Sequence, residues 1–475
     1  AEALAVAANA GAVSVGLNAA VADNYTKNIA RILGGDADTL LVTGALNLGA
    51  YGMATANAQV WGVSAGAISV LGSAAVALVR NEQRALVEGG SITAGSLSAI
   101  SSLNQDLSGM QYVDAAGVPG AGNVLQDTLD RDSGKAAVFA GLITGNGGAI
   151  AVTADVAVAY GRAVSLANIL PHSLQITGNG SVNVSSVGSA NVLSQSLNQS
   201  LGAITATVIV NVAYSQSEFS AVLEIPAGGS AQADTVTIST DYIASAKAVV
   251  APSAGGVSGE VVGLKVNLAI ANAGSTARAA ITGSGSLTAN AINVLANGVA
   301  LSEAYNITPV LSGSGIMVAA NVLVALLDAQ NSAYIQDVAI TGAAVTVHAT
   351  LNNGDNQGAK AKLGNSVQGS TSITLLGVGA NVAVALDRAV NHAYLDGVAL
   401  TDGKTVSIQA DGKSYAVVTV DEATVDINLV SIGVNVTVAR ADGDFRAYIL
   451  TGEGQTVRAV LVTVENNYES YAYAE

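Results

Sequence analysis

The sequence predicts an all-β protein: an elongated β-solenoid, built as a right-handed parallel β-helix from about eight copies of a repeat of about 55 residues. Three observations predict this fold: the composition, a recurring strand-like segment, and a second motif in phase with it. Half of the 475 residues are apolar, 11% are charged and 4% are aromatic. A globular domain carries about 25% charged residues and has a core of larger side chains. The interior must therefore pack from small groups over a long contact, as stacked repeats do.

The recurring segment, here called the marker strand, alternates small and β-branched residues around a central polar residue. Clear copies occupy 13–22, 262–271, 377–385 and 432–439. With the weaker copies included, the central residues are Asn18, Ser73, Asp155, Asn211, Asn267, Asn321, Asn381 and Asn435, spaced by 55, 82, 56, 56, 54, 60 and 54 residues. We expect residues 1–475 to form a single repeat array with copies centred near these positions.

The second motif is an Ala-x-Ile/Leu/Val triplet that follows each central residue by twelve to fourteen residues. Only in the fourth copy does the triplet, at 221–223, arrive two residues early. Each triplet is followed by a turn and then by another alternating segment, as at 291–296, 344–349 and 405–410. Period-two alternation with β-branched residues predicts that these segments are strands. We expect helix below about 10%. With two or three coils per copy, sixteen to twenty-four coils would form a rod of roughly 75 to 115 Å.

The two faces of the marker strand differ in side-chain size. One carries bulky residues such as Val378 and Val382, and the other carries small ones such as Gly379, Asn381 and Ala383. A solvent-facing strand would place Lys, Glu or Thr on its outer side, so we expect the small face to be covered as well as the bulky one, by a second layer that approaches closely. For the recurrent asparagine, a structural ladder of stacked amides is favoured over a repeated ligand contact.

Tyr334, Tyr394 and Tyr448 occupy one phase in the last three copies. Stacking of these rings between adjacent coils is favoured; the alternative is an exposed row of tyrosines that binds sugars. The 82-residue spacing contains about 27 extra residues, and we expect an inserted loop at approximately 104–136 with one short helix. A tolerated insertion is favoured over a binding loop.

Both ends of the sequence fall inside the repeat and lack polar caps. The chain begins at Ala1 without the basic and apolar regions of a signal peptide, so we expect a processed protein or a fragment. We therefore expect the natural protein to continue in both directions.

Residues for catalysis or metal binding are sparse. The three histidines, His172, His348 and His392, sit in different phases of the repeat, and Cys is absent. We expect His348 on a strand and His392 in a turn. Because metal sites and catalytic triads need convergent partners, no catalytic, cofactor-binding or metal-binding residue is assigned, and no cofactor is expected.

Two acidic groups, 130–134 and 442–444, resemble calcium loops only faintly, and solvated turns are favoured for both. Gly145–Gly148 resembles a phosphate loop without its Lys-Ser/Thr, which indicates a turn. A carbohydrate-active β-helix enzyme would need paired carboxylates, or a carboxylate with Lys or Arg, on one face of the stack. The charged residues are instead scattered singly among the copies, so we expect no enzymatic activity.

The charge balance limits the possible partners. Eighteen basic against 34 acidic residues give a net charge of −16 without a basic run, so nucleic acid is not expected as a partner. The longest apolar stretches, such as 375–386, are shorter than the roughly 18 to 20 residues of a spanning helix. No transmembrane helix is expected in this segment.

The in-phase combination of Gly-Val-Gly-x-Asn-Val-Ala-Val-Ala at 377–385, the Ala-Tyr-Ile triplet and the Val-x-Val-x-Ala strand resembles the repeat region of large exported bacterial adhesins, the filamentous haemagglutinin-like and leukotoxin-like family. The resemblance covers nearly the whole chain and implies a secreted β-solenoid on the bacterial cell surface. Its partners would be a host-cell or matrix receptor, or neighbouring copies in a filament. The expected function is a structural and adhesive shaft segment; the alternatives are a leukotoxin-like cytolytic surface protein and a carbohydrate-active β-helix enzyme.

Overall fold

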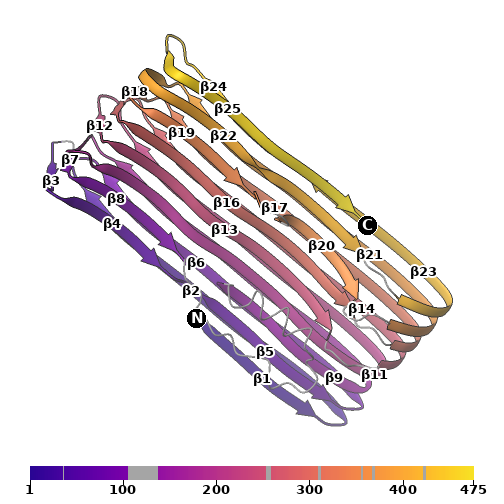
Figure 1. Ribbon diagram of the computed structural model, residues 1–475. Coiled ribbons are helices and arrows are strands. Elements are labelled where there is room, and N and C mark those ends of the chain that lie inside the picture. The colour runs from indigo at the N-terminus through magenta and orange to yellow at the C-terminus, as the bar shows by residue number, and fades with distance from the viewer. Residues whose placement is uncertain are drawn as a thin grey trace.

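The computed structural model describes residues 1–35, 37–104, 137–252, 258–308, 312–354, 357–365, 370–420 and 424–475. The predicted fold class is confirmed: 86% of the described residues lie in strands, and none of them lies in a helix. Every strand pairing in the described residues is parallel, and together the strands form one continuous sheet that winds into a solenoid (Figure 1). The N-terminus lies on the first coil and the C-terminus on the last (Figure 1).

Each copy of the repeat forms one complete coil. Asn267 pairs with Asn321, Asn321 with Asn381 and Asn381 with Asn435, so neighbouring coils are offset by one repeat. The expectation of two or three coils per copy is therefore wrong. Eight coils at the usual strand spacing make a stack of only about 38 Å. The error arose because each coil consists of two very long strands, whereas ordinary strands have about 3 to 10 residues.

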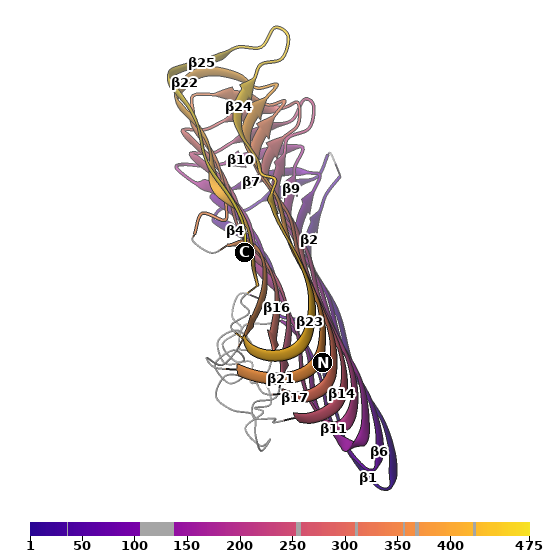
Figure 2. The same cartoon turned by 90° about the vertical axis from the view of Figure 1, so that its right-hand side faces the viewer.

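The coils have two layers that face each other (Figure 2). The layer that contains the marker strands, here called the marker layer, consists of β2 (Val13–Leu33), β6 (Ile68–Glu88), β14 (Ser258–Thr282), β17 (Ser312–Gln336), β21 (Ser370–Asp396), β23 (Thr424–Ala441), β24 (Asp444–Leu450) and the later parts of β9 (Val138–Leu170) and β11 (Ser181–Glu224). In these strands the alternating segments predicted from the sequence pair in register from coil to coil.

The opposite layer, here called the return layer, carries the chain back. It consists of β1 (Glu2–Ala10), β4 (Ala45–Gly52), β5 (Ala56–Ala65), β8 (Ser96–Leu103), β13 (Thr235–Pro252), β16 (Ala291–Thr308), β19 (Ala344–Leu351), β20 (Gly358–Asn365), β25 (Val457–Ala474), the later part of β22 (Ala399–Val420) and the earlier parts of β9 and β11. Short strands join the layers at one end: β3 (Thr39–Leu41), β7 (Ser91–Ala94), β10 (Ser173–Ile176), β12 (Ser230–Gln232), β15 (Ser286–Thr288), β18 (Ala339–Thr341) and the start of β22.

At the other end β9 and β11 bend as they pass from the return layer into the marker layer, and β14, β17, β21 and β23 are curved where they begin (Figure 2). In β9 this bend contains Gly145–Gly148. A methyl group at Gly148 would overlap the carbonyl oxygen of Gly66 on the preceding coil. Gly148 is therefore needed because two backbones approach closely at the corner, whereas Gly145 and Gly147 meet no such contact.

The small face of the marker strand points inward, as expected, and the return layer covers it. Ala383 and Ala385 are fully buried in a core composed largely of alanine. Near the triplets a second core contains larger aliphatic side chains, such as Ile335 and Val347. The expectation that the bulky face is covered as well is wrong within the chain: this face points outward, and Val156 and Val208 on it are partly exposed.

Strand pairing corrects the alignment of the fourth copy. Asp155 pairs with Ile209, which pairs with Asn267, so the centre of this copy lies two residues before Asn211. Its triplet at 221–223 is consequently in register with the triplets of the neighbouring coils. Of the predicted insertion at 104–136, Asn104 accepts a hydrogen bond through its Oδ1 from the backbone N–H of Ala54 on the preceding coil. Residues 105–136 lie outside the described residues, as does the acidic group at 130–134.

Candidate functional site

The predicted asparagine ladder is confirmed. Within the solenoid the Nδ2 atom of Asn267 donates to Oδ1 of Asn321 at 2.9 Å. Asn321 donates to Asn381 at 2.8 Å, and Asn381 donates to Asn435 at 2.9 Å. Asn306, on the return layer, also donates to Asn321 at 2.7 Å. The amides therefore join four successive coils and tie the two layers together.

Replacing Asn321 with alanine is expected to lower the free energy of unfolding by about 2 to 3 kcal/mol. The change leaves the donors of Asn267 and Asn306 and the acceptor of Asn381 without this partner, and unsatisfied buried polar groups are costly. Urea denaturation measures the effect. Asn297→Ala, at an exposed position on the return layer, should change stability by less than about 0.5 kcal/mol. An Asn321→Ala variant of unchanged stability that lost a binding activity would favour the ligand alternative.

The predicted tyrosine stacking is also confirmed. The ring centroids of Tyr334 and Tyr394 are 4.7 Å apart, those of Tyr394 and Tyr448 are 4.9 Å apart, and the planes are nearly parallel. The guanidinium of Arg278 lies over the Tyr334 ring at 5.1 Å. The rings thus stabilise contacts between coils.

Two carboxyl groups lie inside the solenoid. Burial raises the pKa of Asp387 to about 7, although the backbone N–H of Tyr415 donates to the carboxylate at 2.7 Å. Burial raises the pKa of Asp155 to about 6, against hydrogen bonds from Thr144 and Asn198. Both groups tie the marker layer to the return layer, and neither lines the groove described below.

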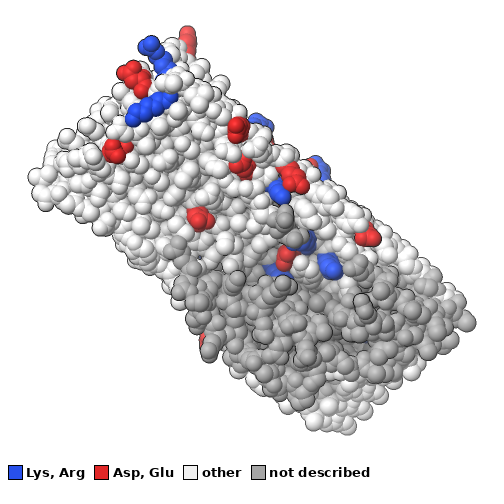
Figure 3. All heavy atoms as spheres, viewed as in Figure 1, with Lys and Arg blue, Asp and Glu red and all other residues white. Residues whose placement is uncertain are grey.

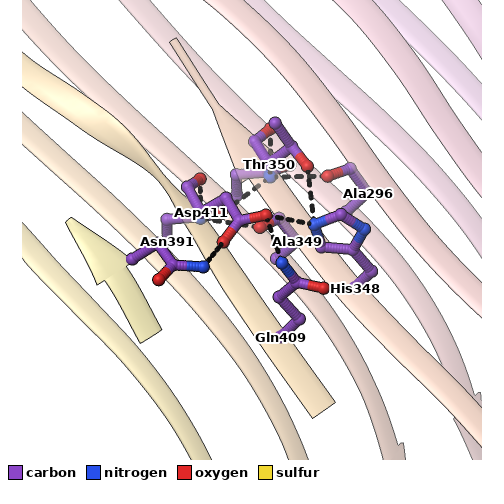
Figure 4. Close-up of polar contacts among 9 residues, drawn as sticks. Ala296, His348, Ala349, Thr350, Asn391, Gln409 and Asp411 are labelled. Carbon is purple, nitrogen blue, oxygen red and sulfur yellow. Dashed lines mark hydrogen bonds and ion pairs between the residues drawn. The ribbon is translucent and has the colours of Figure 1, made fainter. Parts of the chain in front are cut away.

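Figure 4 shows a polar network around Asp411 on the return layer. His348 Nε2 lies 2.9 Å from Asp411 Oδ2 and 3.1 Å from Thr350 Oγ1. Partial burial opposes ionisation of Asp411, but hydrogen bonds from Asn467, His348 and Gln409 outweigh it and keep the pKa of Asp411 below its usual value.

This network differs from a catalytic triad. A triad histidine contacts the acid through one ring nitrogen and the nucleophile through the other. Here Asp411 and Thr350 both contact Nε2 of His348. Behind them, Asn391 of the marker layer donates to the carbonyl oxygens of Ala349 and Asp411 at 2.9 and 2.8 Å (Figure 4). The network therefore has the geometry of a tie between the layers.

His348 lies on a strand, as predicted. The prediction of a turn at His392 is wrong: this residue lies within β21, because the marker-layer strand is longer than the sequence pattern indicated, and its Nε2 is 3.2 Å from Asp444. His172 is exposed near the short strand β10. Asp442 pairs with Arg440, and Asp444 pairs with Arg446. In the described part of the chain, no three His, Cys, Asp or Glu side chains gather as metal ligands would.

A groove of about 520 Å³ crosses five coils on the outer face of the marker layer. Its volume lies within the usual range of ligand sites. Four exposed charged side chains line it, each from a different coil: Arg162, Glu218, Asp328 and Arg388. Within the described residues, none of these four forms an ion pair. The groove is the main candidate for contact with a partner.

Uncharged polar groups complete the lining of the groove. They come from Gln216, Asn272, Thr276 and Gln330, and Tyr214 contributes a ring that stacks on Tyr160 at 5.4 Å. Amides, hydroxyls, a tyrosine ring and charges of both signs suit a polar, hydroxyl-rich ligand. On the part of the opposite face that is drawn uncovered in Figure 3, the charged side chains lie mainly over the C-terminal coils.

The sequence matches no protein-family profile and no curated protein, and no solved structure matches the chain. The described residues include no helix with the length and apolar character required to cross a membrane.

Sequence reasoning missed the groove. Its charged residues come from four different coils, and along the sequence they look like isolated charges. Strand pairing places Arg162, Gln216, Gly274, Asp328 and Arg388 in one row. An alignment of the eight copies by their outward-facing positions, in this register, could have identified this row of polar and charged residues from the sequence.

Proposed function

We propose that this chain is a non-enzymatic structural and adhesive shaft segment of an exported bacterial surface protein. The observation that carries the proposal is the in-register stack of eight coils, joined internally by the asparagine and tyrosine ladders. Each coil contacts its neighbours along its full length, so the stack suits a load-bearing role. The resemblance to the repeat regions of large adhesins supports the same function.

The groove supports the adhesive part of the proposal. It offers Glu218, Asp328 and Arg388 to a partner across several coils, and these charges lack ion-pair partners in the described residues. A hydroxyl-rich chain, such as the glycan of a host-cell or matrix receptor, could lie along it. Polar groups at fixed positions would supply specificity.

The test is binding of the purified chain to host-cell layers and to immobilised matrix glycans. The wild-type chain should bind, and an Asp328→Asn/Arg388→Gln variant should bind at least about tenfold more weakly, as expected when charged contacts are lost. Asp241→Asn is the matched control, because Asp241 is an exposed aspartate on the opposite face. It should bind like the wild type, and all variants should keep the same melting temperature.

Three other outcomes would contradict the proposal. Failure of the wild-type chain to bind any cell or matrix surface would exclude adhesion. Release of dye from lipid vesicles would favour the cytolytic alternative. Release of reducing ends from a polysaccharide, lost in Asp328→Asn, would favour the carbohydrate-active enzyme.

A further inference from the structure

The outer face of the marker layer changes character halfway along its strands. In the first half of each strand, every outward position carries Val, Ile, Leu, Ala or Gly. We call this surface the aliphatic field; it comprises the outward residues of 13–21, 68–76, 150–158, 204–212, 262–270, 316–324, 376–384 and 430–438. The second half of the same face carries charges, such as the ion pair between Arg80 and Asp23 at 2.8 Å.

The return layer has the composition expected of a face in water. In β13 the outward positions include Thr237, Ser239, Asp241 and Lys247, while the inward positions are apolar apart from Thr240. Alternation of this kind is normal for a sheet with one solvated face. The aliphatic field lacks it, because its outward positions carry only aliphatic side chains and glycine, whereas the polar ladder residues lie on the inner face.

The side chains of the field are accessible even in the middle of the stack. Val156 is 38% exposed, Val208 40%, Ile204 45% and Leu264 42%. Five outward residues along eight paired strands cover roughly 27 by 34 Å, about 900 Å². Soluble monomers rarely expose contiguous apolar patches of more than about 300 to 600 Å². A stable protein interface buries about 800 Å² on each partner, so the field has the area of one side of a dimer.

We propose that two copies of this chain pack face to face through the aliphatic field. This inference goes beyond the proposed shaft function and does not depend on it. Two such fields are self-complementary sheets, and sheets that pack face to face bury aliphatic side chains between them. The net charge of −16 disfavours an anionic membrane as the occupant. A second copy of the chain is compatible with this net charge, because the charged side chains of its marker layer lie outside the field.

The position of the field suggests the symmetry of the pair. A two-fold axis between the sheets, parallel to the stacking direction, makes the facing strands antiparallel and superposes field on field. The charged half of each marker layer then extends beyond the partner, so the ion pairs and the groove stay in water. Central outward residues such as Val208 would face their own counterparts across the axis.

The test is the mass of the chain in solution by sedimentation equilibrium. The wild-type chain should be a dimer at micromolar concentration. Val156→Lys/Val208→Lys should be a monomer with an unchanged melting temperature and circular dichroism spectrum. Ile243→Lys is the matched control: it lies in the same coil as Val208, is 44% exposed and faces outward from the return layer. It should remain a dimer.

A cross-link tests the axis independently. The chain has no Cys, so Val208→Cys introduces a single thiol. Facing sheets lie about 10 Å apart, which is too far for a disulfide but within reach of a short bismaleimide linker, so this linker should join two Val208→Cys chains and leave Ile243→Cys uncoupled. A wild-type monomer at tens of micromolar would overturn the proposal, as would a dimer that survives both lysines. Co-sedimentation of a monomeric wild-type chain with phosphatidylcholine vesicles would assign the field to lipid instead.

Discussion

Replacing Asp387 with asparagine is expected to raise the free energy of unfolding at pH 8 by on the order of 2 to 4 kcal/mol. Burial raises the pKa of this carboxyl to about 7 in the folded chain, whereas an unfolded aspartate titrates near 3.9. At pH 8 the folded chain must hold a buried charge with few partners, which is costly. The amide is neutral at every pH and can still accept the hydrogen bond from the Tyr415 N–H.

The same pKa shift determines how the wild-type stability varies with pH. Between about pH 4 and pH 7 the folded state retains a proton on Asp387 that the unfolded state has released. Stability is therefore fully present at about pH 4 and falls as the pH rises through 7, and Asp155, with a pKa of about 6, adds a loss of the same sign. Urea denaturation at pH 5 and pH 8 measures this slope, which should be shallower in Asp387→Asn. Asp241→Asn, at an exposed site, should keep the wild-type slope, and a wild-type stability that rose from pH 5 to pH 8 would contradict the expectation.

Removing one whole coil is expected to leave the rest of the solenoid folded. Deletion of residues 267–320 joins Val266 to Asn321, and because Asn267 and Asn321 are paired in register, each later residue replaces its equivalent one coil earlier. Repeat stacks gain stability from nearest-neighbour contacts. The variant should keep its circular dichroism per residue and a cooperative melt, with a stack shorter by about 4.8 Å.

Deletion of residues 267–321, which is longer by one residue, is the matched control. It places Val322 where Asn267 stood, so the side chains of the marker strand after the junction turn to the opposite face. Bulky residues such as Val322 and Val324 would then enter the alanine-rich core. We expect loss of the coils after the junction, seen as reduced strand content and aggregation. Equal folding of the two variants would show that coil register does not control the fold, and failure of both would argue for one closed domain.

The sequence determined the strands, the repeat and the ladders. Alternation fixes which residues share a face, and a constant repeat length places equivalent residues on adjacent coils. The sequence alone therefore predicts contact between the ladder residues of adjacent coils, which are Asn267, Asn321, Asn381 and Asn435. The groove and the buried carboxyl groups could not, because both depend on residues from different coils and layers.

Tertiary structure decided three further features: how many coils a copy makes, which face points inward, and where the fourth copy is centred. The sequence does not show whether an alternating stretch folds as several short strands or as one long strand. It therefore leaves the number of corners per repeat undetermined. The marker strand carries aliphatic side chains on one face and small residues with the central asparagine on the other, so the rule that polar residues face water could not assign the inner face. Packing decides, because two layers that approach closely leave room for Ala383 and Ala385 but not for Val382 and Val384. In the same way, Ile209 and Asn211 share the inner face. Only the pairing of Ile209 with Asp155 and Asn267 shows that Ile209 is the centre of the fourth copy.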